Sequence, residues 1–293
     1  MNNFKKIKVQ IINAFVDNDA GGNPAGVVLN ADNLTNEEKL KVAKKVGLSE
    51  TAFVSKSKIA DYKLDFFTPT RQIAHCGHAT IATFSYLSQL GLIKNSISSK
   101  ETIDGVREII IQEDLAFMEQ KQPLYTNVKN HSDEILKSLG LTENDILPNA
   151  PISIVNTGNS FAIIPVANEE ILKNIIPNFD LITQISDEFD LIGYYVFSTQ
   201  TNTLNIDATT RMFAPSYGIN EEAGTGMAAG PLASYFFDIL EIKKDRLLIQ
   251  QGLFMNPPSQ SLIIVDLFLE KGKIKKIMAG GKGISIKSML IEI

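Results

Sequence analysis

The sequence predicts an α+β (mixed α/β) protein of two pseudo-symmetric domains, each a curved, mostly antiparallel sheet or barrel around a central buried helix. Short alternating or β-branched runs, typical of strands, dominate both halves of the chain. The segments 80–90 and 231–240 have helical character and carry almost no charge, and a helix that is apolar on nearly every side belongs in the interior. The order of strand, turn and apolar helix occurs twice, which indicates a duplicated plan.

In the first half, alternating and β-branched residues predict strands at 7–16, 26–30, 51–55 and 61–68. The stretch Gly-Gly-Asn-Pro at 21–24 predicts a turn between the first two strands.

One surface helix is also predicted in this half. The spacing of Leu40, Ala43 and Val46 predicts a helix over 36–47, with Thr35 as its N-cap and Gly47 as its stop.

The second half repeats this order, with strands predicted within 151–166, 194–199 and 204–214. At the two junctions between strand and apolar helix, an isoleucine follows a proline by four residues. This shared order favours an internal duplication over coincidence. Because proline removes a helix hydrogen bond, the second helix either has a distorted first turn or begins near Pro231.

Length and composition limit the protein's class. The chain has 293 residues, above the common domain size of about 100–150, so two domains are expected: 1–122, joined by the last strand 278–293, and 123–277. A net charge of -5 argues against nucleic-acid binding. A single cysteine excludes an intramolecular disulfide, and neither a secretory pattern nor a membrane-length apolar run is apparent. We therefore expect a cytoplasmic protein with no membrane partner.

The entrances of the two apolar helices, HCGHAT at 75–80 and NEEAGTGMAAG at 220–230, are the candidate functional segments. The first turn of a helix has free backbone N–H groups and favours negative charge, and glycine lets a ligand approach closely. The segments therefore suit a carboxylate, although their glycines are equally consistent with tight packing alone.

Metal and cofactor binding fit these segments poorly. A zinc site needs three or four converging ligands, whereas His75 and Cys76 alternate on an extended segment, so no metal is expected. The glycines of GTGMAAG follow two acidic residues, which would repel a dinucleotide's pyrophosphate, so no cofactor is expected. Cys76 next to a histidine allows a nucleophile, but a lone cysteine is more often a small buried hydrophobe.

Carboxylates are the remaining candidates for chemistry. Glu50 lies in SETAFV, and Glu221 and Glu222 lie at the second helix entrance. A carboxylate in a partly dry pocket has a raised pKa and becomes a proton carrier near neutrality. Taken singly, Glu50 also fits a surface position and Glu222 a helix N-terminal acid.

Four motifs carry a resemblance across essentially the whole chain: AFVDNDAGGNPAGVVL, LSETAFV, LDFFTPTRQIAHCGHATIAT and RMFAPSYGINEEAGTGMAAGPLASYF, at 14–29, 48–54, 64–83 and 211–236. With them the sequence resembles the PhzF-like (phenazine biosynthesis) family, which has the diaminopimelate epimerase-like fold. The resemblance implies two similar α/β domains, a site in the cleft between them, and a homodimer.

The resemblance also implies roles for individual residues. Glu50 matches the family's catalytic glutamate, which carries the proton, and His78 matches a histidine that positions the substrate. The second motif usually reads Glu-Asp-Pro-x-Thr-Gly-Ser, so this chain departs from it at Glu222, Ala223 and Met227. Because Met227 replaces a hydroxyl that would contact a substrate carboxylate, the resemblance leaves the identity of the substrate open. The substrate-binding set expected from the resemblance is Gly77, His78, Glu222, Thr225, Gly226 and Met227.

The cysteine count separates two chemistries of this fold. Epimerases and racemases of the fold use two facing thiols, whereas here Cys76 occupies the first position and Ala223 the second. A two-cysteine epimerase is therefore not expected. The hypothesis is a cofactor-independent isomerase in which one glutamate moves a proton on a small carboxylate-bearing metabolite, as the family's best-known member does on dihydro-3-hydroxyanthranilate. The alternative is a non-catalytic small-molecule-binding protein on the same fold.

Overall fold

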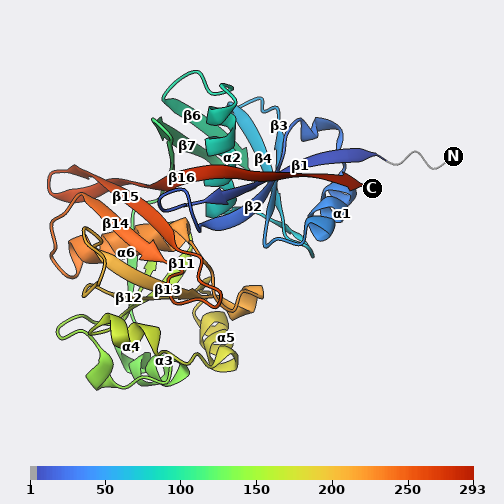
Figure 1. Cartoon of the computed structure of the whole chain (residues 1–293). Helices are drawn as coiled ribbons and strands as arrows, with labels where there is room; N and C mark the ends of the chain where they lie inside the picture. The colour runs from blue at the N-terminus through green and yellow to red at the C-terminus, as the bar shows by residue number, and fades with distance from the viewer. Residues whose placement is uncertain (1–4) are drawn as a thin grey trace. The chain divides into compact units, whose positions relative to one another are not determined.

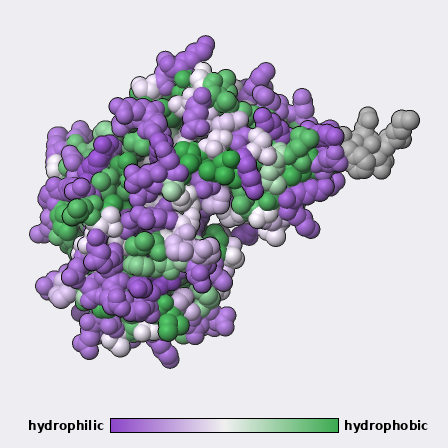
Figure 2. All heavy atoms as spheres, viewed as in Figure 1, coloured by the Kyte–Doolittle hydropathy of each residue, from purple (hydrophilic) through white to green (hydrophobic). Residues whose placement is uncertain are grey.

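The structure, a computed structural model, describes residues 5–293 (Figure 1). It divides into two compact units: unit 1 comprises the chain up to Glu119 together with Gly280–Ile293, and unit 2 comprises Gln120–Ala279. No helix among the described residues is long and apolar enough to cross a membrane. The face seen in Figure 2 is mostly hydrophilic, with hydrophobic side chains in scattered patches.

Unit 1 is a closed barrel around one helix. Its strands pair in the order β1-β2-β3-β4-β6-β7-β8-β16, and β16 pairs back onto β1. The strands are β1 Lys6–Ala14, β2 Asn23–Val28, β3 Thr51–Ser55, β4 Tyr62–Phe67, β5 Gln72–Ile73, β6 Ile97–Thr102, β7 Gly105–Gln112, β8 Leu115–Gln120 and β16 Lys273–Glu292. Helix α2, Gly77–Gln89, is buried along most of its length, whereas α1, Asn36–Val46, covers the barrel beside the short 3-10 helix η1, Ala31–Asn33.

Unit 2 is a sheet in the order β16-β15-β14-β13-β12-β11-β10-β9. The strands are β9 Leu124–Asn127, β10 Ser153–Asn156, β11 Ser160–Pro165, β12 Gly193–Ser198, β13 Ala208–Phe213, β14 Arg246–Gln251 and β15 Ser261–Glu270. The helices are α3 Ser132–Ser138, α4 Glu169–Lys173, α5 Phe179–Glu188 and α6 Gly226–Asp238, and the 3-10 helices are η2 Lys129–His131, η3 Glu143–Asp145 and η4 Pro215–Tyr217. α3, α4 and α5 share one core cluster with the sheet, while α6 is buried on nearly all sides.

The two units repeat one pattern of strand pairing. From β1 to β7 in unit 1 the successive pairs are antiparallel, parallel, antiparallel, parallel and antiparallel. From β10 to β15 in unit 2 the same series occurs. In both units the buried helix lies in the crossover of the second parallel pair, from β4 to β6 and from β13 to β14. The predicted fold class and duplication are confirmed.

The two aligned isoleucines have matching roles at these crossovers. Ile73 pairs back onto Phe66 of β4, and Ile219 pairs back onto Ala214 directly after β13. Each therefore turns the chain after its proline and directs it toward the entrance of the buried helix.

Some local predictions hold and others are wrong. α1 begins with a capping box between Thr35 and Glu38 and ends at Gly47, which has a φ of 72°. The turn predicted at 21–24 is wrong in its second half, because Asn23 and Pro24 already pair with β1. The strand predicted over 204–214 begins only at Ala208.

The position of Pro231 is now clear. α6 begins at Gly226, so Pro231 lies inside the helix, where its ring removes the hydrogen bond to the carbonyl of Met227. Burial of almost the whole helix compensates, since packing rather than intrinsic propensity stabilises most protein helices.

Candidate active site

The entrance of α2 is assembled from two chain segments of unit 1. Cys76 is the extended N-cap residue of α2, with φ -148° and ψ 125°, and Gly77 is the first helical residue. Glu50 immediately precedes β3, and its carbonyl oxygen accepts the N–H of Gly26 at 3.1 Å. Only glycine fits there, because a Cβ at position 26 would lie 2.8 Å from Oγ1 of Thr51. Backbone pairing thus fixes Glu50 in front of the helix.

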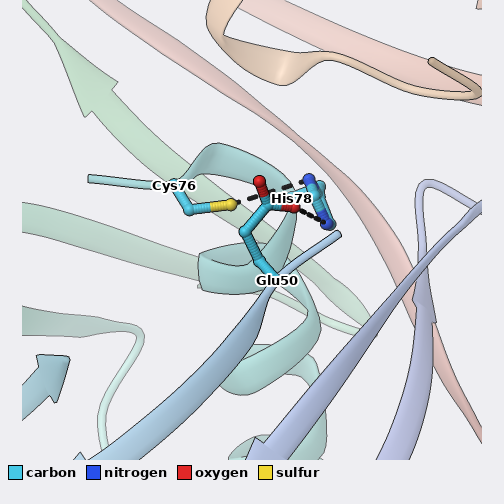
Figure 3. A group of neighbouring side chains, drawn as sticks. All are labelled: Glu50, Cys76 and His78. Atoms are coloured by element: carbon cyan, nitrogen blue, oxygen red, sulfur yellow. Dashed lines mark hydrogen bonds and ion pairs between the residues drawn. The ribbon is translucent and has the colours of Figure 1, made fainter. Parts of the chain in front are cut away.

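The side chains of Glu50, Cys76 and His78 meet at this entrance (Figure 3). Nε2 of His78 lies 3.3 Å from Oε2 of Glu50, and Nδ1 of the same ring lies 3.6 Å from Sγ of Cys76. All three residues are buried, with exposed fractions of 7%, 7% and 4% for Glu50, Cys76 and His78. One imidazole therefore connects a carboxylate and a thiol in a largely dry environment.

The environment of Cys76 favours its neutral form. Burial raises the pKa of the thiol and the charge of Glu50 acts in the same direction, whereas His78 opposes both. A reactive cysteine normally has a lowered pKa. Cys76 thus has the character of a protonated thiol rather than of a nucleophilic thiolate.

Among residues 5–293, the side chains that lie close enough together to hold a metal ion are those of Glu50, Cys76 and His78. One ligand atom from each of Glu50, Cys76 and His78 lies within 4.8 Å of the other two, and zinc accepts all three types. Within the sequence, His75, Cys76 and His78 are the candidate ligands in HCGHAT, whereas Glu50 is distant from them and joins the group only in the folded chain. However, the two nitrogens of His78 face different partners, so a cation bound there would have to replace one of these contacts.

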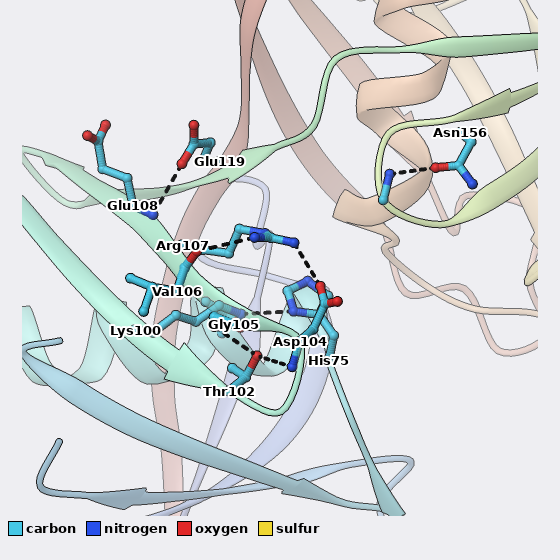
Figure 4. Close-up of polar contacts among 12 residues, drawn as sticks. His75, Lys100, Thr102, Asp104, Gly105, Val106, Arg107, Glu108, Glu119 and Asn156 are labelled. Atoms are coloured by element: carbon cyan, nitrogen blue, oxygen red, sulfur yellow. Dashed lines mark hydrogen bonds and ion pairs between the residues drawn. The ribbon is translucent and has the colours of Figure 1, made fainter. Parts of the chain in front are cut away.

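His75 has a different environment, which contains a buried lysine (Figure 4). Lys100 of β6 has an exposed fraction of 0%, and its Nζ lies 3.3 Å from Nδ1 of His75. Nζ also donates to Oγ1 of Thr80 at 2.6 Å, and Thr80 donates to the carbonyl of Cys76 at 2.6 Å. Lys100 thus supports the N-cap residue of α2 through one intermediate hydroxyl.

Sequence reasoning missed Lys100. Burial lowers the pKa of Lys100 to about 7. In the sequence it alternates with Ser98 and Thr102, a polar pattern typical of a solvent face, yet all three side chains are buried. The pattern of strand alternation was present, but nothing in it showed that the polar face points inward.

The entrance of α6 in unit 2 is organised by a buried glutamine that the sequence also did not reveal. Oε1 of Gln251 accepts the N–H of Thr225 at 3.0 Å and the hydroxyl of Tyr195 at 3.0 Å. Its Nε2 donates to the carbonyl of Glu222 at 2.7 Å and to Oγ1 of Thr225 at 3.0 Å. The Thr225 hydroxyl in turn donates to the Glu222 carboxylate. Glu222 and Thr225 are therefore held together around Gln251.

The two adjacent glutamates make different contacts. Glu221 forms a bidentate pair with Arg211, with both N–O distances at 2.8 Å. Nη1 of Arg211 additionally donates to the carbonyls of Leu172 and Ile175, at 3.3 and 3.2 Å. Glu221 thus anchors the loop to unit 2, and Glu222 is the carboxylate at the helix entrance.

The predicted site residues form one group in each unit. In unit 1, Glu50, Gly77 and His78 lie together at the start of α2. In unit 2, Glu222 and Thr225 are hydrogen-bonded, and Gly226 and Met227 begin α6. The carbonyl of Gly226 accepts a hydrogen bond from Gln120 at 2.8 Å, and Met227 is half-buried.

Comparison with known proteins agrees with this architecture. The sequence model of the PhzC-PhzF family, described as "Phenazine biosynthesis-like protein", matches residues 12–288. An uncharacterized isomerase of Clostridium acetobutylicum is 35% identical over 239 residues, covering 79% of each chain. The crystal structure of a Bacillus anthracis phenazine biosynthesis protein of the PhzF family superposes with a TM-score of 0.88 at 29% identity, covering 99% of this chain and 100% of that one.

A more distant structure supports the fold alone. A hydroxyproline epimerase from Agrobacterium vitis has a TM-score of 0.62 at 10% identity, covering 100% of this chain and 93% of that one. The predicted epimerase-like fold is thereby confirmed. The matched family model and the relatives show that the chain belongs to the phenazine biosynthesis-like PhzC-PhzF family, as an enzyme of the isomerase class.

Proposed function

We propose that the protein is a cofactor-independent isomerase in which Glu50 removes a proton from one carbon of a small carboxylate-bearing metabolite and returns it to another. The observation that carries this proposal is the buried contact of 3.3 Å between Glu50 and Nε2 of His78 at the start of α2. A positioned carboxylate in a dry environment is a competent general base. The positive end of the α2 dipole lies at the same place and favours a carboxylate of the substrate.

A single acid/base group is consistent with the residues present. The chain contains one cysteine, and Ala223 occupies the second helix entrance, so a pair of thiols is not available. In the proposed reaction Glu50 takes a proton from an activated C–H bond and the electron pair shifts along the substrate. The Glu50 carboxyl group, whose proton exchanges with solvent, then protonates the new carbanionic carbon, so no redox partner is required.

We assign orientation of the substrate to the remaining predicted residues. His78 and Gly77 are the proposed contacts from unit 1, and Glu222, Thr225, Gly226 and Met227 are those from unit 2. In support, Thr225 and Gln251 hold Glu222 in a defined position, as orientation of a substrate requires. Met227 offers an apolar surface where the family motif has serine, which favours a substrate different from that of the phenazine enzyme.

The test measures exchange of deuterium from solvent into a probe. Dihydro-3-hydroxyanthranilate and trans-4-hydroxy-L-proline are suitable probes, because the first is the substrate of the family's best-known member and the second is bound by the epimerase of the same fold. For any probe that the wild type exchanges, Glu50→Gln should reduce the exchange rate at least about a hundredfold, as expected for loss of a general base. The exposed Glu37 of α1 provides the control: Glu37→Gln should exchange at the wild-type rate.

Two results would contradict the proposal. Undiminished exchange in folded Glu50→Gln would remove Glu50 from the role of base. Binding of a probe by the wild type, with neither exchange nor conversion, would instead favour the non-catalytic binding protein.

A further inference from the structure

Cys76 has a defined partner although the fold's pair of thiols is missing. It is the chain's single cysteine, and its Sγ lies 3.6 Å from Nδ1 of His78. The opposite nitrogen of the ring faces Glu50 at 3.3 Å. Figure 3 shows the thiol and the carboxylate on the same side of the ring, each joined by a dashed line to a different ring nitrogen. The thiol is thus placed to act on Glu50 through His78.

The two neutral forms of His78 differ in how they satisfy these contacts. With the proton on Nε2, the positive N–H edge of the ring lies beside the Glu50 carboxylate, 3.3 Å away, and the lone pair of Nδ1 accepts the thiol S–H. With the proton on Nδ1, the lone pair of Nε2 would face a carboxylate oxygen, and two acceptors would repel each other without water between them. The first form keeps the thiol hydrogen bond and places a positive N–H edge beside the carboxylate, whereas the second places a lone pair there.

The state of the thiol supports the same assignment. A thiol donates a hydrogen bond only while it is protonated, and burial raises the pKa of Cys76. Alanine at this position would leave Nδ1 without this donor, whereas serine would retain one. The identity of residue 76 therefore affects the state of the histidine.

We propose that Cys76 is a positioning residue whose thiol donates to Nδ1 of His78, thereby confining the ring proton to Nε2, the nitrogen that lies 3.3 Å from the Glu50 carboxylate. This inference extends the proposed function, in which Glu50 is the base, and gives Cys76 a role other than that of a nucleophile. Cys76 does not exchange a proton with the substrate. It fixes the tautomer of the histidine that orients the base.

The experiment is ¹⁵N NMR of the histidine rings at pH 7.5 in buffer containing EDTA, which requires no substrate. The chain has three histidines, so His75→Asn and His131→Asn assign the signals of His78 by subtraction. In the wild type, Nε2 of His78 should show the shift of a protonated nitrogen, and Nδ1 the shift of an unprotonated nitrogen that accepts a hydrogen bond.

Variants at position 76 separate hydrogen bonding from packing. In Cys76→Ala the exposed Nδ1 lone pair accepts a proton more readily, and the doubly protonated fraction should rise about tenfold at the same pH, equivalent to one hydrogen bond of about 1.4 kcal/mol. Cys76→Ser retains a donor and should keep the wild-type pattern. Backbone amide spectra establish that each variant is folded.

Several outcomes would overturn the inference. They are a wild-type ring protonated on Nδ1, a doubly protonated ring, a metal-bound shift that persists in EDTA, or a folded Cys76→Ala variant with the wild-type spectrum. If Cys76→Ala does not fold, the wild-type spectrum alone still shows whether Nε2 of His78 carries the proton and whether Nδ1 accepts a hydrogen bond. Because no turnover is measured, failure of the exchange experiment with Glu50→Gln would refute the proposed base without altering the tautomer result.

Discussion

Lys100 is a charged residue type in a fully buried position, which its polar sequence context does not indicate. Its ammonium group lies inside the barrel with hydroxyl, imidazole and aromatic neighbours, 5.2 Å from the centre of the Phe66 ring. Burial is the largest cause of the lowered pKa of Lys100, and among the nearby charged side chains Arg107 acts in the same direction whereas Asp104 opposes it. The folded protein therefore favours the neutral amine at a pH where the unfolded chain is fully protonated.

This difference predicts a pH-dependent stability. The pKa of Lys100 is about 7 in the folded protein, below its usual value near 10.4, so the unfolded chain binds more protons from about pH 7 to 10. The free energy of unfolding should therefore contain a component that rises with pH across this range, by up to about 1.4 kcal/mol per pH unit. Below pH 7 the component is constant and unfavourable.

Urea denaturation between pH 6.5 and 9.5 would measure the component as the difference between wild type and Lys100→Met. Relative to the variant, the wild type should gain stability as the pH rises. In Lys94→Met, which replaces an exposed lysine, the free energy of unfolding should depend on pH as it does in the wild type. If the difference in the free energy of unfolding between wild type and Lys100→Met stays constant over this pH range, Lys100 does not titrate there.

At the scale of elements, the entrance of α6 depends on a side chain from another strand. Gln251 at the end of β14 satisfies the N–H of Thr225, the carbonyl of Glu222 and the hydroxyl of Tyr195. Burial raises the pKa of Tyr195, so its phenol remains neutral and donates. The helix entrance is thus held by a buried polar network rather than by its own N-cap side chain.

Replacing Gln251 by leucine should therefore destabilise unit 2. The substitution leaves buried donors and an acceptor without partners, at a cost of about 1–3 kcal/mol for each group that water does not reach. Thermal unfolding should show a lowered midpoint, and any exchange activity should fall because Glu222 loses its support. Gln184→Leu on the exposed face of α5 is the matched control, and an equal loss of stability there would contradict the role of Gln251.

Elements whose signals are local could be predicted from the sequence. α1 was predicted with its N-cap Thr35 and its stop Gly47, because capping involves residues within one turn. Local signals left two possible starts for α6, before Pro231 or near it, and packing around the helix, which overrides local propensity, decides for the first. Glu50 and His78 were identified through family motifs. Their contact with Cys76, and the separate pairing of Glu221 with Arg211, depend on strands that meet only in the folded chain.

At the scale of the whole molecule, unit 1 depends on the two ends of the chain. β1 pairs with β16 in register from Lys6 with Glu292 to Ala14 with Gly283. β16 also lies beside β8, so closely that a Cβ at Gly280 would lie 2.1 Å from the carbonyl oxygen of Ala116. Without β16 the barrel would have two unpaired edges.

Deletion of Gly280–Ile293 should therefore open unit 1 selectively. Hydrogen exchange measured by mass spectrometry should show loss of protection in β1 and β8, because their partner is removed. Peptides from α3 and α5, which share a core within unit 2, should retain their protection and provide the internal control. Unchanged protection in β1 would show that the barrel does not depend on β16.

The pairing of β1 with β16 also has a consequence for synthesis. A ribosome makes residues 6–119 first, but the barrel that they form lacks a wall until 280–292 have left the exit tunnel. Unit 2 is complete in the nascent chain before unit 1 can close, although domains generally fold in the order of translation. The barrel that contains Glu50 therefore closes only after unit 2 has been synthesised, so the two units are completed in the reverse of the order in which they begin.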